Sequence, residues 1–235
     1  MKKSTLALAL FGAVIATPAS AAIQTLSGNY FDLSYNDAQA SLFGTPTIVG
    51  NVVQWFPSGS PGFSTTSAGD GVKSVQSSFE LTLTAKSGYQ INGFTLNEGG
   101  DYYYFGDGLV GVNAGGILRV TPQAPYSGAV TSSITETAVF TSNPLFNFNT
   151  KNWNATAFAG LATPAIKANV AIDNLLSAYT PLGSFPTDSF IEKKEAFLNV
   201  NVKAVPEPAT YTIFLVGLLG LIGAVVGRRR QVRLD

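Results

Sequence analysis

Apolar and polar residues alternate in short runs along the chain from Ala22 to Ala204, and no long helical period interrupts them. In the clearest run, 79–85, four apolar side chains point one way, and a glutamate and two threonines point the other. Similar runs occupy 31–35, 49–55, 110–120, 134–140, 153–159, 166–172 and 196–204. About eight to ten short strands separated by turn residues predict a mainly β fold. The favoured architecture for 22–204 is a single antiparallel β-sandwich, with a jelly-roll as its more specific variant.

Turn residues and one break in the alternation predict how neighbouring runs connect. The apolar phase slips by one residue just before Phe94, and a bulge at Gly93 absorbs this slip if 79–85 and 90–96 form a hairpin with Phe94 opposite Leu83. Further along the chain, we expect a turn at 114–116, a short helical turn at 175–179 and loops at 57–71 and 141–152.

The first 21 residues have the three parts of a secretory signal peptide. Two lysines at 2–3 are followed by the apolar run 6–16, and small residues then occupy 19–21. We expect cleavage after Ala21, with Ala22 as the alternative. The chain is therefore predicted to be exported.

The other end of the chain, 205–235, predicts a membrane segment with a fixed orientation. Residues 209–227 carry no charge, and nineteen residues of helix span about 28 Å, close to the thickness of a hydrocarbon core. The tail that follows, 228–235, is basic and should stay in the cytoplasm, which leaves 22–204 outside the inner membrane. Two prolines hold the preceding segment, 205–208, in an extended conformation.

These C-terminal features together resemble the PEP-CTERM sorting signal over residues 205–230. The residues that carry the resemblance are Val205, Pro206, Glu207, Pro208, Arg228, Arg229 and Arg230. The resemblance implies a Gram-negative host that makes extracellular polysaccharide and an exosortase-type membrane peptidase that recognises the Pro-Glu-Pro segment and removes the tail. The same segment is also catalogued as the C-terminal domain of an ice-binding protein, but two threonines at 82 and 84 are too few for an ice-binding face. A permanent transmembrane anchor is the alternative for 209–227.

Composition excludes several classes of function. The chain has 235 residues with no histidine and no cysteine, so it has no imidazole base, no disulfide and no ordinary zinc, iron–sulfur or haem site. The body, 22–204, has eight basic and twelve acidic residues, a net charge of −4 that disfavours binding to nucleic acid. We therefore expect no cofactor, no metal and no nucleic-acid partner.

A tyrosine-rich and acidic stretch, 97–108, is the richest candidate for ligand binding. Tyrosines on a sandwich can stack on sugar rings while carboxylates accept hydrogen bonds from hydroxyls, and three of the carboxylates could instead share a calcium ion. Ordinary strand residues closed by glycine turns are the plainer interpretation. The candidate residues are Glu98, Asp101, Tyr102, Tyr103, Tyr104 and Asp107.

No pattern selects catalytic residues. A pair of carboxylates is the minimum for glycoside hydrolysis, but no spacing singles out two of Glu80, Glu98, Asp101, Asp107 and Glu136. The charged run 192–195 is interpreted as a solvated turn before the last strand. We therefore predict that the protein is not an enzyme.

Three functions remain as hypotheses. The first is an exported protein that signal peptidase and an exosortase process, and that serves as a structural or adhesive sandwich at the cell surface or in the polysaccharide matrix. The second makes the body a carbohydrate-binding module for the host polysaccharide, and the third makes it a membrane-anchored enzyme acting on glycans. All three require transient or lasting contact with the inner membrane.

Overall fold

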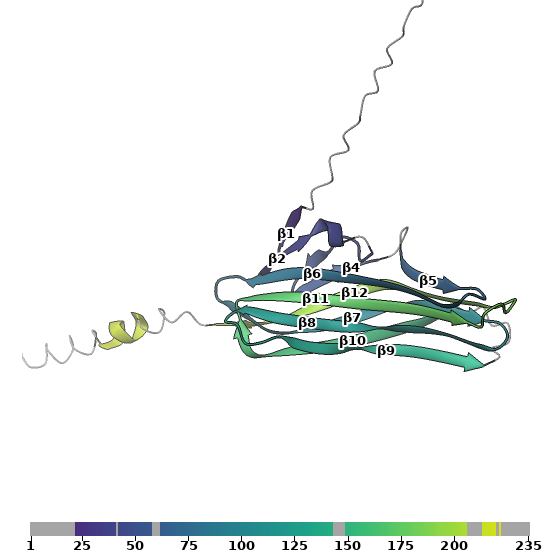
Figure 1. Ribbon diagram of the computed structural model, residues 1–235. Helices are drawn as coiled ribbons and strands as arrows, with labels where there is room; N and C mark the ends of the chain where they lie inside the picture. Colours follow the sequence, from purple (N-terminus) through teal and green to yellow (C-terminus); the bar gives the residue numbers. More distant parts are fainter. Residues whose placement is uncertain are drawn as a thin grey trace, which may run out of the picture.

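Two antiparallel sheets packed face to face make up the body of the protein (Figure 1). The computed structural model describes residues 22–40, 42–57, 62–142, 149–205, 213–219 and 221, apart from the side chains of 135–138 and 142. The predicted mainly β, sandwich-like architecture is confirmed. The jelly-roll variant stays a prediction, and the predicted signal peptide, 1–21, lies outside the described residues.

Six strands form the first sheet, which we call sheet A. In spatial order they are β1 (Ile23–Ser27), β2 (Phe31–Asn36), β6 (Gly71–Ala85), β11 (Lys167–Thr180), β8 (Leu109–Ala124) and β9 (Val130–Ser142). A single turn of 3₁₀ helix, η1 (Asp37–Gln39), follows β2. The centre of this sheet is therefore β6, β11 and β8.

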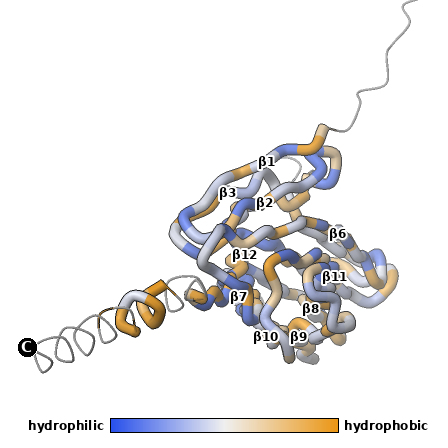
Figure 2. The backbone as a smooth tube through the Cα atoms, turned by 90° about the vertical axis from the view of Figure 1, so that its left-hand side faces the viewer, coloured by the Kyte–Doolittle hydropathy of each residue, from blue (hydrophilic) through white to orange (hydrophobic). Residues whose placement is uncertain are grey.

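The second sheet, sheet B, places the last strand of the body in its centre. In spatial order its strands are β10 (Lys151–Ala165), β7 (Tyr89–Phe105), β12 (Asp188–Ala204), β4 (Val52–Trp55) and β3 (Thr47–Val49), and β5 (Phe63–Ser67) also pairs with β12. After a quarter-turn of the molecule, β6, β11 and β8 are seen in one layer and β12 and β7 in the other (Figure 2).

Aromatic side chains fill one part of the core between the sheets. The Phe79 ring on β6 lies 5.5 Å from the Tyr35 ring, 5.5 Å from Phe43 and 5.3 Å from Trp55, measured between ring centroids. Phe43 comes from the connection between η1 and β3, and its ring is also 5.6 Å from that of Phe63. Edge and tilted contacts of this kind add to the burial of large apolar surfaces, so this cluster helps to hold the two sheets together.

The predicted hairpin of 79–85 with 90–96 is wrong. The first run lies in β6 of sheet A and the second in β7 of sheet B, so Leu83 pairs with Leu33 and Ala168, and Phe94 does not pair with it. The two runs contribute to the same core from opposite sheets instead. Periodicity cannot distinguish these arrangements, because both bury the same side chains.

The predicted slip before Phe94 nevertheless corresponds to a real bulge. In the pairing of β7 with β12, Gly93 lies opposite Asn201 and Ile91 opposite Val202, which leaves Asn92 without a counterpart. A second bulge lies in β12, where Lys194 is left over. Each bulge moves the following side chains to the other face, so it decides which residues reach the core.

Several smaller predictions are also corrected. Strand β8 runs straight through the predicted turn at 114–116, and β11 runs through the predicted helical turn at 175–179. The predicted loop 57–71 contains β5, and the charged run 192–195 lies within β12. Strands of up to 17 residues are the result, longer than the short strands expected, because bulges and glycines let a strand continue where the sequence resembles a turn.

Part of the predicted C-terminal membrane segment, 209–227, is described, and residues 213–219 and 221 are helical. Within the described ranges, no helix reaches the length and apolarity that crossing a membrane requires. The other residues of the segment, and the arginines at 228–230, lie outside the described residues.

Replacing Phe79 with alanine should destabilise the sandwich strongly. The side chain is fully buried among three aromatic rings. Its truncation should lower the free energy of unfolding by about 3–5 kcal/mol. Chemical denaturation measures this loss. The matched control is Phe158→Ala, because Phe158 is 61% exposed and its loss should change stability by no more than about 0.5 kcal/mol. Equal effects of the two substitutions would contradict this account of the core.

Candidate functional site

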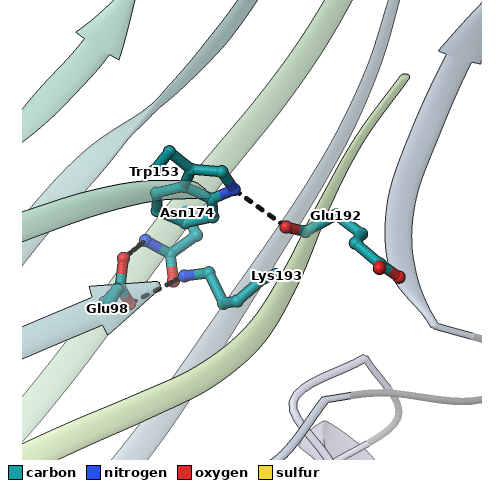
Figure 3. A network of polar contacts seen from close by, with 5 residues as sticks. All are labelled: Glu98, Trp153, Asn174, Glu192 and Lys193. Carbon is teal, nitrogen blue, oxygen red and sulfur yellow. Dashed lines mark hydrogen bonds and ion pairs between the residues drawn. The ribbon is translucent and has the colours of Figure 1, made fainter. Parts of the chain in front are cut away.

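Three polar side chains meet in the middle of the sandwich (Figure 3). Glu98 comes from β7, Lys193 from β12 and Asn174 from β11 in the opposite sheet. Lys193 Nζ lies 2.7 Å from Glu98 Oε1 and donates a 2.5 Å hydrogen bond to Asn174 Oδ1, while Asn174 Nδ2 donates to Glu98 Oε2 at 2.9 Å. The side chains of Lys193 and Glu98 are 0% and 1% exposed. The three groups form a closed and dry triangle.

Strand alternation brings each of these side chains inward. Glu98 follows the core residues Phe94 and Leu96 at alternate positions of β7, and Asn174 follows Ile172 in the same way on β11. Lys193 reaches the core because the bulge at Lys194 changes the phase of β12.

Two glycines make room for this cluster. Gly100 is paired with Lys193, and a Cβ atom there would collide with the carbonyl of Glu192 and with the Trp153 indole nitrogen. Gly116 is paired with Asn174, and a Cβ atom there would collide with the backbone of Asp173. The close approach of the chains beside the cluster therefore requires glycine at both places.

The surroundings of Lys193 disfavour its charge and partly compensate for it. Burial lowers the pKa of the Lys193 ammonium, and the nearby Glu98 carboxylate acts in the opposite direction. The rings of Phe43 and Phe63 lie 5.4 Å and 5.2 Å from Nζ, within the range of a cation–π contact. Beside the cluster, Trp153 Nε1 donates a 2.8 Å hydrogen bond to the carbonyl oxygen of Glu192.

A polar groove of about 470 Å³ lies on sheet A, beside β1 and β2. Its floor is Ala171 on β11, which pairs with Glu80 of β6 on one side and with Arg119 of β8 on the other. Neighbouring strands lie about 4.8 Å apart, so the backbones of the two charged residues are separated by about 10 Å across the alanine. A small residue between two long ones forms the hollow.

Unpaired polar groups line this groove. Glu80 and Arg119 are exposed, and neither has a hydrogen-bond or ion-pair partner among the described residues. In the next row, Thr82 donates a 2.9 Å hydrogen bond to Asn169 Oδ1, which leaves the amide nitrogen of Asn169 available as a donor. Thr121 completes this row. The groove therefore presents a cation, an anion and neutral groups within a small area.

The tyrosines predicted as one ligand-binding patch are divided between two faces of β7. Tyr102 is buried, and its ring stacks on that of Tyr104 at 5.9 Å. Tyr103 points to the other face, where it stacks on Phe190 at 5.3 Å and donates a 3.1 Å hydrogen bond to Asp188 Oδ2. Burial raises the pKa of the Asp188 carboxyl, against the hydrogen bond from Tyr103. The structure therefore does not bring the three tyrosines together as one platform.

The carboxylates of the same stretch are also separated. Glu98 is in the core, Asp101 lies on the outer face as an ion-pair partner of Lys194, and Asp107 accepts a 2.9 Å hydrogen bond from the backbone nitrogen of Gly108 in the following loop. They cannot share one calcium ion in this arrangement. Within the described part of the chain, no group of three or more acidic side chains is placed to hold a metal ion.

Sequence reasoning missed four of the residues that form these two sites. Lys193 was hidden by the turn expected at 192–195, and Asn174 was hidden because the expected strand ended at Ile172, shortly before the helical turn expected at 175–179. Asn174 could have been found by continuing the alternation of β11. Arg119 and Asn169 carried no signal, because only the pairing of β8, β11 and β6 places them together.

The last strand leads directly into the C-terminal signal. β12 ends at Ala204, and the backbone nitrogen of Val205 donates a 2.8 Å hydrogen bond to the carbonyl oxygen of Gly88. Residues 204–230 match the PEP-CTERM protein-sorting motif. A PEP-CTERM motif implies export in a Gram-negative bacterium and processing by an exosortase, a membrane peptidase. The match covers this segment alone.

Two of the solved structures that are similar to this chain were determined in complex with a carbohydrate. The winged bean acidic lectin with methyl-α-D-galactose is 10% identical, with a TM-score of 0.25 over 77% of this chain and 100% of the lectin. TmCBM61 with β-1,4-galactotriose is 12% identical, with a TM-score of 0.18 over 60% of this chain and 88% of the module. These TM-scores are low, and the likeness carries no argument about a ligand. No curated protein matches the chain.

Replacing Gly100 with alanine should disrupt the buried triangle. The added methyl group collides with the Glu192 carbonyl, which cannot move without shifting the bulge beside Lys193. We expect a loss of about 1–3 kcal/mol in the free energy of unfolding, the usual effect of overpacking. The control is Gly160→Ala on the neighbouring strand, where the added atom meets the ring of exposed Phe158. Thermal unfolding of both variants measures the difference, and an unaffected Gly100→Ala protein would contradict this packing.

Proposed function

We propose that this PEP-CTERM protein is an exported, non-catalytic adhesive or structural module of the cell surface or polysaccharide matrix. Residues 1–21 direct its export, and 209–227 hold the precursor in the inner membrane with the arginine tail in the cytoplasm. An exosortase then cuts the chain near 206–208 and frees the sandwich for its place outside the cell.

The observation that carries this proposal is the junction between the sandwich and the sorting motif. The motif match begins at residue 204, the last residue of β12, so the sandwich is followed by its sorting signal without a linker. Because β12 is an inner strand of sheet B, the sorting signal is attached to the end of a strand that has neighbours on both sides. Attachment without a linker suits a sandwich that is held close to the inner membrane in the precursor and close to the cell surface after processing.

The groove on sheet A supports a role in binding without catalysis. Glu80 is the one carboxylate among its lining residues, whereas glycoside hydrolysis uses a pair of carboxylates on either side of the bond to be cleaved. We therefore expect no glycan hydrolysis by this face of the protein.

The sorting proposal predicts that the extracellular protein lacks its tail. Mass spectrometry of the protein secreted by its host should find a C-terminus near 206–208 and no peptide from 209–235. Replacing Pro206, Glu207 and Pro208 with alanine should keep the tail attached and the protein in the membrane fraction. Lys203→Ala, just before the motif, should be processed normally. An extracellular protein that still carries 209–235 would refute the proposed processing.

A second candidate function, carbohydrate binding, is favoured by the free polar groups of the groove. Sugars present hydroxyls that are both donors and acceptors, and they are recognised by charged and amide side chains such as Arg119, Glu80 and Asn169. The position of this groove differs from the tyrosine patch that the sequence suggested. We propose the polysaccharide of the host matrix as the ligand.

Substitution in the groove tests carbohydrate binding. Arg119→Ala removes a charged donor, and a lost hydrogen bond to a charged group is worth about 1.5–3 kcal/mol, or about a tenfold or larger loss of affinity. Retention of the full chain on purified host polysaccharide should fall accordingly in affinity electrophoresis. Lys203→Ala removes the same charge from sheet B and should leave retention unchanged. Equal retention of the Arg119→Ala and unsubstituted proteins would reject the groove as the binding site.

A further inference from the structure

The buried triangle contains the parts of a reaction that neither the sorting signal nor the groove uses. It joins a primary amine, Lys193 Nζ, a carboxamide, Asn174, and a carboxyl group, Glu98, each in contact with the other two. We propose that Lys193 and Asn174 form an intramolecular isopeptide bond, with Glu98 as the group that transfers the protons. The bond would join β12 of sheet B to β11 of sheet A.

The distances place the amine beside the carboxamide before any reaction. Nζ of Lys193 lies 2.5 Å from Oδ1 of Asn174, the oxygen bonded to the carbon that would be attacked. Both side chains are held on the central strands of their sheets, so little freedom remains to be lost on the way to the transition state. Holding two groups in this way is the largest advantage that an intramolecular reaction has over the same reaction in solution.

The interior also makes the amine reactive. An ammonium ion has no lone pair and cannot attack a carbonyl, so the neutral amine is the nucleophile. Burial lowers the pKa of Lys193, which favours this neutral form. The proton that the ammonium loses has an acceptor 2.7 Å away in Glu98 Oε1.

Atoms and protons balance without any further reactant. The Lys193 amine forms a bond to Cγ of Asn174, and the carbonyl electrons move to Oδ1 to give a tetrahedral intermediate. Glu98, which now carries the proton of the former ammonium, donates it to Nδ2. Oδ1 re-forms the carbonyl as the bond between Cγ and Nδ2 breaks, Nδ2 leaves as ammonia, and Glu98 takes up the proton that the former amine nitrogen loses. Glu98 Oε2 is placed for the transfer to Nδ2, because it already accepts a 2.9 Å hydrogen bond from this atom.

The product would be a covalent connection between the sheets in a chain that has no cysteine. The two bonded residues are 19 positions apart, so the new bond closes a loop that includes the connection from β11 to β12. Strand β12 is also the strand that continues into the PEP-CTERM motif. A pull on the C-terminus of the sandwich would therefore be passed to the centre of sheet A through a covalent bond.

Peptide mass spectrometry of the folded full chain tests the proposal directly. Trypsin cuts after lysine, so a chain without the bond yields separate cuts after Lys167, Lys193 and Lys194. With the bond, Lys193 is no longer a substrate, and the peptide 168–194 should appear with a mass lower by about 17 Da, one ammonia. A second cut after Tyr179 divides this peptide into two arms, 168–179 and 180–194. The bond between Asn174 and Lys193 should keep the two arms joined as one branched product.

The possible results separate the bond from other modifications. An uncleaved Lys193 together with joined arms after the Tyr179 cut supports the proposal. Normal cleavage at Lys193 with the full mass overturns it. Loss of ammonia from Asn174 with arms that separate also overturns it, because that result means cyclisation of the asparagine alone.

A matched pair of variants tests the role assigned to Glu98. Glu98→Gln keeps the shape of the side chain, but its neutral amide does not take up and release a proton as a carboxylate does. The folded variant should therefore show no loss of ammonia, and trypsin should cut after Lys193. Glu195→Gln changes a carboxylate on the same sheet that lies outside the triangle, and it should form the bond as the unsubstituted protein does. Circular dichroism establishes that each variant is folded. A Glu98→Gln protein that forms the bond at an unchanged rate would refute the role of Glu98. If this variant does not fold, the mass of the peptide from the unsubstituted chain still shows whether the bond is present.

Discussion

A single lysine carried into the dry interior is the constraint on which the centre of the sandwich depends. Lys193 cannot reach water, so its amine must be satisfied by what the two sheets supply, namely Glu98 from its own sheet and Asn174 from the opposite one. Breaking such a set by removing one partner leaves a buried polar group unsatisfied, which is far more harmful than never having placed it there. The registers of β7, β11 and β12 are thereby tied to one another.

This constraint explains features that have no other evident purpose. The bulge at Lys194 turns Lys193 inward and releases Lys194 to the surface, where it meets Asp101. Gly100 and Gly116 leave space for the chains beside the triangle, and the rings of Phe43 and Phe63 cover the amine. The aromatic cluster around Phe79 shares Phe43 with the triangle, so the apolar and the polar parts of the core are one packing unit.

The buried lysine and the start of the sorting motif both belong to β12. Lys193 lies in the N-terminal part of this strand, and the match to the sorting motif begins at its last residue, Ala204. The surface that would meet a ligand lies on the other sheet, where Glu80 and Arg119 stand on either side of Ala171. The triangle and the start of the sorting motif therefore share β12, whereas the proposed ligand-binding groove is on the other sheet, and substitutions in the groove can be separated from effects on the other two.

Many elements of this architecture follow from local pattern. The alternation in 31–35, 79–85 and 196–204 appears as β2, β6 and β12, and the phase slip before Phe94 appears as a bulge. The same counting would have placed Glu98 in the core by continuing from Phe94 and Leu96. It fails for Lys193, because counting back from Ala196 without a bulge puts Lys194 inside and Lys193 outside.

Local patterns are enough to specify the class of the fold, the end of the last strand and the sorting signal, because each depends on residues that are neighbours in the chain. The pairing of the strands, the placement of β6 and β7 in different sheets, and the meeting of residues 98, 174 and 193 depend on contacts between distant parts of the chain. A period of two residues shows which side chains seek the core but not which strand lies beside or across from them. That choice is made by packing between residues far apart in the chain, and it created both the groove and the triangle.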